Sequence, residues 1–266
     1  GFEVEDQIRF LQLAGKTFEK YGEYSMAQNA MELVLEKCAC FTDIVVATKT
    51  EVEAMHAVGR GTYAGVVSSD QHQLAPMAVG KILGCLQKIC DSLDLFLGLP
   101  TKAQESHAYL ALNACKLLFD MGHPLIWISC GKYIIEMFLF GIMTMNSVIN
   151  LCTPRHLNFR MKMYSSVFLA AVSQDTSDMA AAVLSHCTAA VKELRTREEL
   201  ETPVPELTVR ILGNAECDLD VLRQVLAFWK DADSFNPMAV AESKATYPDK
   251  RDKRLFAEKC FLECCR

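Results

Sequence analysis

The sequence predicts an all-α protein built from stacked helical hairpins. Apolar residues recur at three- and four-residue spacing in most segments, as Ile8, Leu11 and Phe18 do in the first, which places them on one face of a helix. Glycine or proline separates successive segments, for example at Gly22 and Pro100. No segment sustains the apolar-polar alternation of a β-strand. Both a tetratricopeptide-like α-solenoid and an irregular helical bundle fit this pattern.

The first hairpin is predicted within residues 1–56. One helix is expected over residues 4–21 and a second from Tyr24 to about Cys38, with a break at Gly22. Residues 57–74 contain Gly59, Gly61 and several further glycines and serines without a sustained helical period, which predicts a loop.

Residues 75–200 are predicted to continue the stack of hairpins. Thr101 is expected to cap the start of one helix, with Gln104 completing a capping box. The helices expected in this part cover residues 77–97, 101–122, 124 to about 140, 154 to about 172, and 177 to about 200.

Residues 201–266 are predicted to form a C-terminal helical segment of different character. Pro203 and Pro205 mark a break, residues 207–212 are short and partly β-branched, residues 219–229 form a short helix, and a final helix is expected from about Lys250. We expect the chain to be a piece of a longer protein.

The composition argues against nucleic-acid binding and membrane insertion. The 266 residues include 33 acidic and 27 basic residues, giving a net charge of −6 and no basic stripe that could follow a phosphate backbone. An apolar stretch over residues 125–151 is interrupted by Lys132 and Glu136, which favours a buried helix over a membrane span. Twelve scattered cysteines indicate free thiols in a reducing compartment.

No arrangement of residues predicts a cofactor or metal site. Cys38 with Cys40, and Cys260 with Cys264 and Cys265, lack both the C-x-x-C spacing and a nearby histidine. We therefore predict no cofactor, no metal ion and no catalytic residue. A basic group near the end of the chain is a possible contact patch for an acidic partner, although aspartates interrupt it: Lys250, Arg251, Lys253 and Arg254.

The first hairpin matches the register of a tetratricopeptide repeat. The consensus of this repeat has bulky, small, aromatic and glycine residues at fixed offsets. The small residues let its two helices approach closely. The matching residues, which we predict to pack the repeat, are Leu11, Ala14, Gly15, Phe18, Gly22, Tyr24, Ala27 and Met31. The match departs from the consensus at four positions, where Leu11, Ala14, Met31 and Ala39 replace the tryptophan, the leucine, the second bulky residue and the closing proline. A second match, ending at Gly122, is weaker.

The order of features also resembles a known family. The run from Phe10 to Tyr24, the segment 112–122, the helix containing Trp127 and the helix 155–171 look like the N-terminal region of the large cilia- and flagella-associated protein of the central-apparatus projections. That resemblance covers roughly residues 5–200. It implies a helical-repeat scaffold in the cytoplasm and the axoneme. The implied partners are other axonemal scaffold proteins in a large hetero-complex, with tubulin contacted indirectly, and neither nucleic acid nor membrane.

Two other functions remain open on the sequence. A tetratricopeptide-like cytosolic adaptor would bind a peptide in a concave groove, and residues of one charge sign lining that groove would favour it. A small helical enzyme would use one activated cysteine, which would require a thiol of unusual reactivity.

Overall fold

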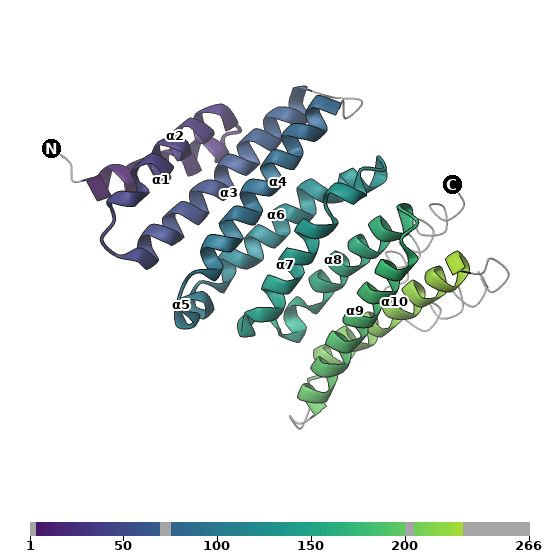
Figure 1. Ribbon diagram of the computed structural model, residues 1–266. Helices are drawn as coiled ribbons and strands as arrows, with labels where there is room; N and C mark the ends of the chain where they lie inside the picture. Colours follow the sequence, from purple (N-terminus) through teal and green to yellow (C-terminus); the bar gives the residue numbers. More distant parts are fainter. Residues whose placement is uncertain (1–3, 70–75, 200–204, 231–266) are drawn as a thin grey trace. The chain divides into compact units, whose positions relative to one another are not determined.

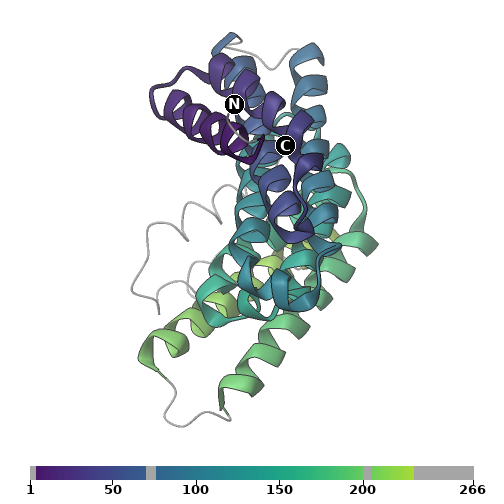
Figure 2. The same ribbon diagram turned by 90° about the vertical axis from the view of Figure 1, so that its left-hand side faces the viewer.

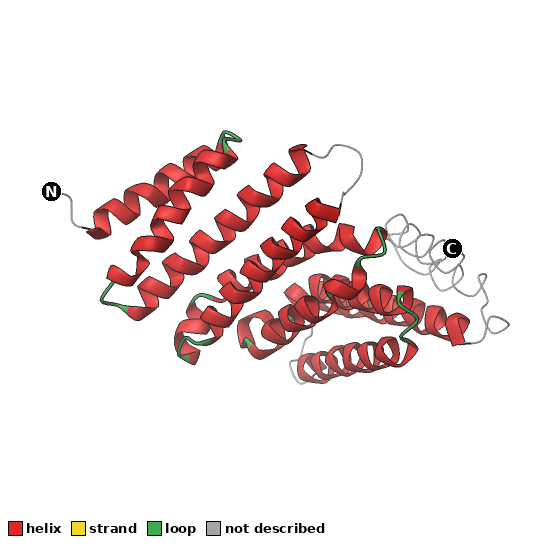
Figure 3. Ribbon diagram, turned by 45° about the horizontal axis from the view of Figure 1, so that its top comes forward, coloured by secondary structure: helices red, strands yellow, loops and turns green. Residues whose placement is uncertain are grey.

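The protein is helical throughout the part of the chain that the computed structural model describes, residues 4–69, 76–199 and 205–230 (Figure 3). These residues contain ten α-helices and three short 3-10 helices and no β-strand. The predicted all-α class is therefore confirmed.

The chain divides into two units, described separately below. Unit 1 comprises residues 1–125 and 136–150, and unit 2 comprises residues 126–135 and 151–266. This division does not coincide with the predicted boundary between residues 200 and 201.

Unit 1 is a stack in which helices that follow one another in sequence lie side by side. Helix α1 packs on α2, α2 on α3, and α3 on α4, while α1 makes only slight contact with α3 (Figure 1). Its elements are α1 (Val4–Lys20), α2 (Tyr24–Lys37), η1 (Cys38–Cys40), α3 (Ile44–Ser69), α4 (Pro76–Leu97), α5 (Thr101–Ser106), α6 (Ala108–Trp127), α7 (Ile135–Ser147) and η3 (Ile149–Leu151), the ends of α6, α7 and η3 falling in unit 2.

The turn between α1 and α2 depends on Gly22. The backbone N–H of Gly22 donates to the carbonyl of Glu19 at 3.0 Å, and that of Glu23 donates to the carbonyl of Phe18 at 2.9 Å. This pair of bonds is a Schellman motif, which needs a left-handed residue after the helix. Gly22 supplies it with φ of +79°.

The predicted loop over residues 57–74 is wrong for residues 57–69, which continue helix α3. Two of its three glycines are packing positions. A Cβ atom on Gly59 would lie 3.0 Å from Cδ1 of Ile89, and one on Gly61 would lie 3.2 Å from the carbonyl oxygen of Tyr24. Small residues are required where helices approach this closely. A segment in which glycines interrupt the apolar periodicity can therefore still be a helix. Residues 70–74 lie outside the described residues.

The start of α3 was also missed. Asp43 accepts hydrogen bonds through Oδ1 from the backbone N–H groups of Val45 and Val46, at 2.8 and 3.3 Å. An aspartate before a run of apolar residues is a recognisable N-cap signal. Its position shows that a third helix begins immediately after η1.

The helix boundaries around residues 100–127 differ from the prediction. Pro100, not Thr101, is the N-cap residue, and the Nε2 group of Gln104 donates to the carbonyls of Leu97 and Leu99 instead of forming a capping box. Helix α6 passes through Gly122 and Pro124 to Trp127. Burial of its residues on both sides of the proline offsets the backbone hydrogen bond that proline cannot make.

Unit 2 contains three helices, each of which packs on the other two. They are α8 (Pro154–Ser173), α9 (Ser177–Glu199) and α10 (Glu206–Lys230), together with the short η2 (Gly131–Tyr133) (Figures 1 and 2). Helix α10 is continuous where a short segment and a separate short helix were predicted. The final helix expected from Lys250 lies outside the described residues.

Helix α8 ends in the same motif as α1, with aspartate in place of glycine. Asp175 has φ of 56°, and the N–H of Thr176 donates to the carbonyl of Ala171 at 3.0 Å. A left-handed aspartate is strained by about 1 kcal/mol. Asp175 Oδ1 accepts a hydrogen bond from Trp229 Nε1 at 3.0 Å, and this bond between the end of α8 and α10 offsets the strain.

His56 and Ser92 form a buried polar contact between α3 and α4. His56 Nε2 lies 3.0 Å from Ser92 Oγ, and Ser92 donates its one hydroxyl hydrogen to the carbonyl of Ile89 at 2.6 Å. The histidine nitrogen is therefore the donor to Ser92. Burial, with a smaller contribution from the charge of Arg60, lowers the pKa of His56 from its ordinary 6.5 to about 4.

This pKa predicts a loss of stability in mild acid. Between pH 6.5 and 4 the unfolded chain binds a proton at this histidine more readily than the folded chain, so stability falls as the pH falls. Lowering the pH from 7 to 5 should cost about 2 kcal/mol through this group. Urea unfolding of the wild type and of His56→Gln at pH 7 and pH 5 measures this loss of unfolding free energy. An equal loss in the variant would contradict the assignment.

Two glycine substitutions should have opposite effects. A Cβ atom on Gly122 would lie 2.6 Å from Cε1 of Phe138, whose ring is fully buried, whereas one on Gly84 meets nothing within 4 Å. Gly122→Ala should lower the free energy of unfolding by about 1–3 kcal/mol through overpacking. Gly84→Ala, the matched control within α4, should raise it by about 0.5–1 kcal/mol. Thermal and urea unfolding test both, and a tolerated alanine at position 122 would contradict the packing.

Candidate interaction surface

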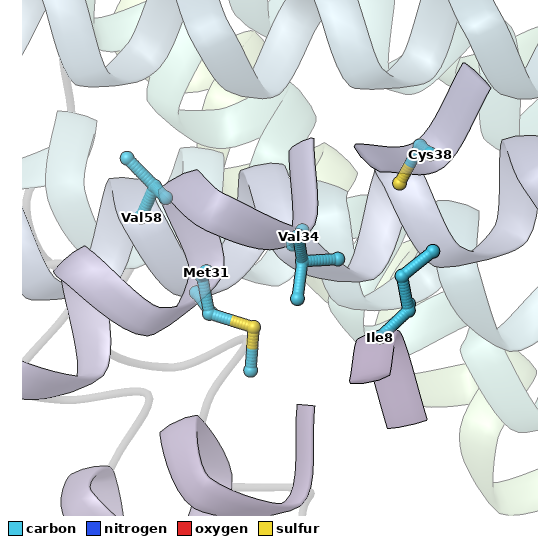
Figure 4. Close-up of a cluster of buried hydrophobic side chains, with 7 residues drawn as sticks. Ile8, Met31, Val34, Cys38 and Val58 are labelled. Carbon is cyan, nitrogen blue, oxygen red and sulfur yellow. The ribbon is translucent and has the colours of Figure 1, made fainter. Parts of the chain in front are cut away.

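The first hairpin encloses an apolar cluster contributed by α1, α2, η1 and α3. Ile8, Met31 and Val34 lie together in it, with Cys38 and Val58 beside them (Figure 4). Ala54 and Ala57 complete the buried set, and Leu11, Leu35 and Phe41 pack against its edge.

The structure places the predicted repeat-packing residues in three different environments. Gly15, Ala27 and Met31 are buried, and a Cβ atom on Gly15 would lie only 2.8 Å from Cε of Met31. Leu11, Ala14 and Phe18 are partly buried, whereas Gly22 and Tyr24 are exposed at the turn. Gly15 therefore lets α1 approach α2 closely at Met31. Leu11 packs against the edge of the apolar cluster.

Charged residues on α1 pair with residues of opposite sign on α3. Lys16 Nζ lies 3.2 Å from Glu53 Oε2, and Arg60 Nη2 donates to Glu19 Oε2 at 3.0 Å. Glu53 also accepts a hydrogen bond from the hydroxyl of Tyr109 on α6 at 3.1 Å. Burial first, and then the charge of Glu53, raises the pKa of Tyr109 to about 12. These side chains satisfy one another and present no surface of a single sign.

The opposite side of α1 carries large apolar side chains that are mostly exposed to solvent. Phe10, Leu13 and Tyr21 are 71%, 66% and 75% exposed. The three-residue spacing of Phe10 and Leu13 places them on one face of α1, away from Ile8 and Gly15, and Tyr21 follows in the turn directly after the helix. Helix α1 therefore has one apolar face in the core and a second, which we call the outer face, in solvent. Sequence analysis missed it because only the core-facing period was considered.

Five of the described cysteines are buried and poorly suited to nucleophilic attack. Burial raises the pKa of Cys38 to about 11 and those of Cys90 and Cys187 to about 12, and it also raises the pKa of Cys85 and of Cys115. A raised pKa reduces the thiolate fraction on which nucleophilic attack depends. These five thiols pack as small apolar side chains.

Of the remaining candidates from the sequence, only Cys38 and Cys40 lie within the described residues. Within residues 4–69, 76–199 and 205–230, no group of three or more histidine, cysteine, aspartate or glutamate side chains is placed to hold a metal ion, including any around Cys38 and Cys40. None of the helices in this range is both long and apolar enough to cross a membrane. Cys260, Cys264 and Cys265, and the basic group Lys250, Arg251, Lys253 and Arg254, lie outside the described residues.

Arg160 is an unusual member of the core of unit 2. It lies on α8 and is 2% exposed, and its Nε and Nη1 atoms have no hydrogen-bond partner among the described residues. Its charge lies close enough to Cys187 on α9 to affect the pKa of that thiol. Burying two guanidinium nitrogens without a hydrogen-bond acceptor is costly.

Comparison with protein-family models, with curated proteins and with solved structures finds no match to this chain. The class of protein rests on its fold. It is an all-α protein with a sequential helix stack in unit 1 and a three-helix unit 2, and one helix of the stack exposes a second apolar face.

Replacing Arg160 with an apolar residue of similar length should not weaken the fold. Arg160→Met should leave the free energy of unfolding unchanged or raise it by about 1 kcal/mol, because it removes a buried charge while keeping the packing. Arg223→Met, which breaks the exposed pair of Arg223 with Asp220, is the control and should change it by less than about 0.5 kcal/mol. A loss of more than about 3 kcal/mol in Arg160→Met would show that the guanidinium has an essential acceptor.

Proposed function

We propose that this chain is a structural scaffold segment that binds other proteins through exposed helix faces. The single observation that carries the proposal is the outer face of α1, where three large apolar side chains are mostly exposed. Contiguous exposed apolar groups on a folded domain mark sites of association. A stack of helices suits this role because each added helix extends the surface available for binding.

The finer proposal places the segment in the axoneme of motile cilia, in a projection of the central apparatus. Its support is the resemblance of the run from Phe10 to Tyr24, and of the later helices, to the large cilia- and flagella-associated protein. The partners would be other axonemal scaffold proteins in a large hetero-complex, with tubulin contacted through them. Assembly would proceed by burial of apolar surface, without a chemical step.

The alternative of a peptide-binding adaptor has less support. Adaptors of the tetratricopeptide kind hold charged peptide groups with side chains of one sign. On the side where α1 meets α3, Lys16 pairs with Glu53 and Glu19 with Arg60, so the charges are already neutralised within the fold. The apolar outer face is the better candidate for binding.

Localisation and proximity labelling in cells with motile cilia test the proposal. The tagged chain should label the central apparatus, and Phe10→Ser, Leu13→Ser and Tyr21→Ser together should abolish that labelling, because they remove the outer face without touching the core. The matched control changes three exposed apolar residues on other helices, Ile44, Met77 and Met143, to serine and should retain the label. A diffuse cytosolic signal from the unaltered chain would overturn the axonemal assignment. Axonemal label in both triple variants would overturn the role of the outer face.

A further inference from the structure

The outer face of α1 has the spacing of a helix-pairing seam. Asp6, Phe10, Leu13, Thr17 and Lys20 follow one another at intervals of four, three, four and three residues, and all five are exposed. Apolar residues at this alternating spacing line the contact between two helices in a coiled coil. Here only the central positions are apolar, and the two ends carry charges of opposite sign.

The charges at the two ends of the seam are placed symmetrically about its centre. Asp6 lies seven residues before Leu13, and Lys20 lies seven residues after it. In an antiparallel pair of identical helices centred on Leu13, each Asp6 meets Lys20 of the other copy, and the contact occurs twice. In a parallel pair, Asp6 would meet Asp6 and Lys20 would meet Lys20. The charge pattern therefore complements itself in one orientation only.

Both end charges are available for such a contact. The carboxylate of Asp6 lies 3.7 Å from Nη1 of Arg9, and both side chains are more than half exposed. Such an exposed ion pair adds little stability, so Asp6 can exchange Arg9 for a lysine of another chain. Lys20 has no ion pair with any residue in the described part of the chain. The core-facing residues Ile8 and Gly15 are on the other side of α1, so pairing through the outer face leaves the hairpin intact.

We propose that the outer face of α1 binds the same face of a second copy of this chain, with the two helices antiparallel and Leu13 at the two-fold axis. This inference rests on the proposed function and names one partner for it. Leu13 packs on Leu13 of the other copy, and Phe10 lies beside Thr17 of the other copy. The pairs of Asp6 with Lys20 fix the direction and register.

The contact is weak and reversible. One seam from each of two 17-residue helices buries less surface than the roughly 1,200 Å² of a standard stable interface. Association therefore depends on protein concentration. In an assembly that holds many copies close together, the effective concentration makes such a contact sufficient.

Analytical ultracentrifugation of the 266-residue chain over a wide range of concentrations tests the proposal. The weight-average mass should rise from one copy towards two. Leu13→Lys, which places two like charges at the axis, should leave a monomer. Met77→Lys is the matched control, because Met77 is an apolar residue of α4 that is 77% exposed and lies away from the seam, and it should dimerise like the wild type.

Exchanging the charges of Asp6 and Lys20 distinguishes the proposed antiparallel register from non-specific apolar association. Asp6→Lys alone, or Lys20→Asp alone, should weaken dimerisation about tenfold, because each places like charges together at two points. The double variant Asp6→Lys, Lys20→Asp should restore it. A monomer at every concentration, or a double variant no better than the single ones, overturns the proposal.

Failure here is distinguishable from failure of the proposed function. A chain that stays monomeric, yet needs Phe10, Leu13 and Tyr21 for axonemal labelling, uses the outer face for a different protein. That result overturns the self-pairing and leaves the scaffold role standing.

Discussion

Glycine lets the helices of unit 1 approach so closely that side chains of one helix touch the backbone of the next, and the arrangement of the stack depends on this approach. Gly15 faces Met31 on α2, Gly59 faces Ile89 on α4, and Gly122 faces the buried ring of Phe138 on α7. At each of these positions a methyl group would come within about 3 Å of a neighbouring atom. Glycine has more backbone freedom in the unfolded chain than other residues, so fixing it in a helix costs more entropy. The dispersion contacts and the apolar burial gained along whole helices offset that cost.

The same feature explains which parts of the fold could be predicted. Helices α1, α2, α4 and α8 follow from the three- and four-residue periodicity of their apolar residues, and the turn after α1 follows from Gly22. The second half of α3 could not be predicted, because glycine within a helix and glycine in a turn look the same in a sequence. Only the position of Ile89 and of the Tyr24 carbonyl decides between them, and neither is local in sequence.

The interaction surface shows a related limit. The core side of α1 was predictable from Ile8, Leu11 and Gly15. Phe10 and Leu13 can form a binding surface only because they stay exposed, and their exposure is a property of the whole fold. Contacts across long stretches of chain were likewise beyond reach. Glu105 accepts hydrogen bonds from the backbone N–H groups of Ile149 and Asn150, more than 40 residues away, and joins α5 to η3. The burial of Arg160, with two of its nitrogens unpaired, runs against its residue type, so no sequence pattern could indicate it.

The sequential packing of unit 1 also has a mechanical consequence. Helix α1 contacts mainly α2, and α2 contacts mainly its two neighbours, so this part of the stack is held chiefly by contacts between successive helices. Such a stack gains its stability locally, interface by interface. Under tension along the chain it would yield one helix at a time, beginning with α1, and would recover quickly when released because short loops close quickly. A segment built in this way absorbs strain in small steps, where a single closed core would resist and then fail at once.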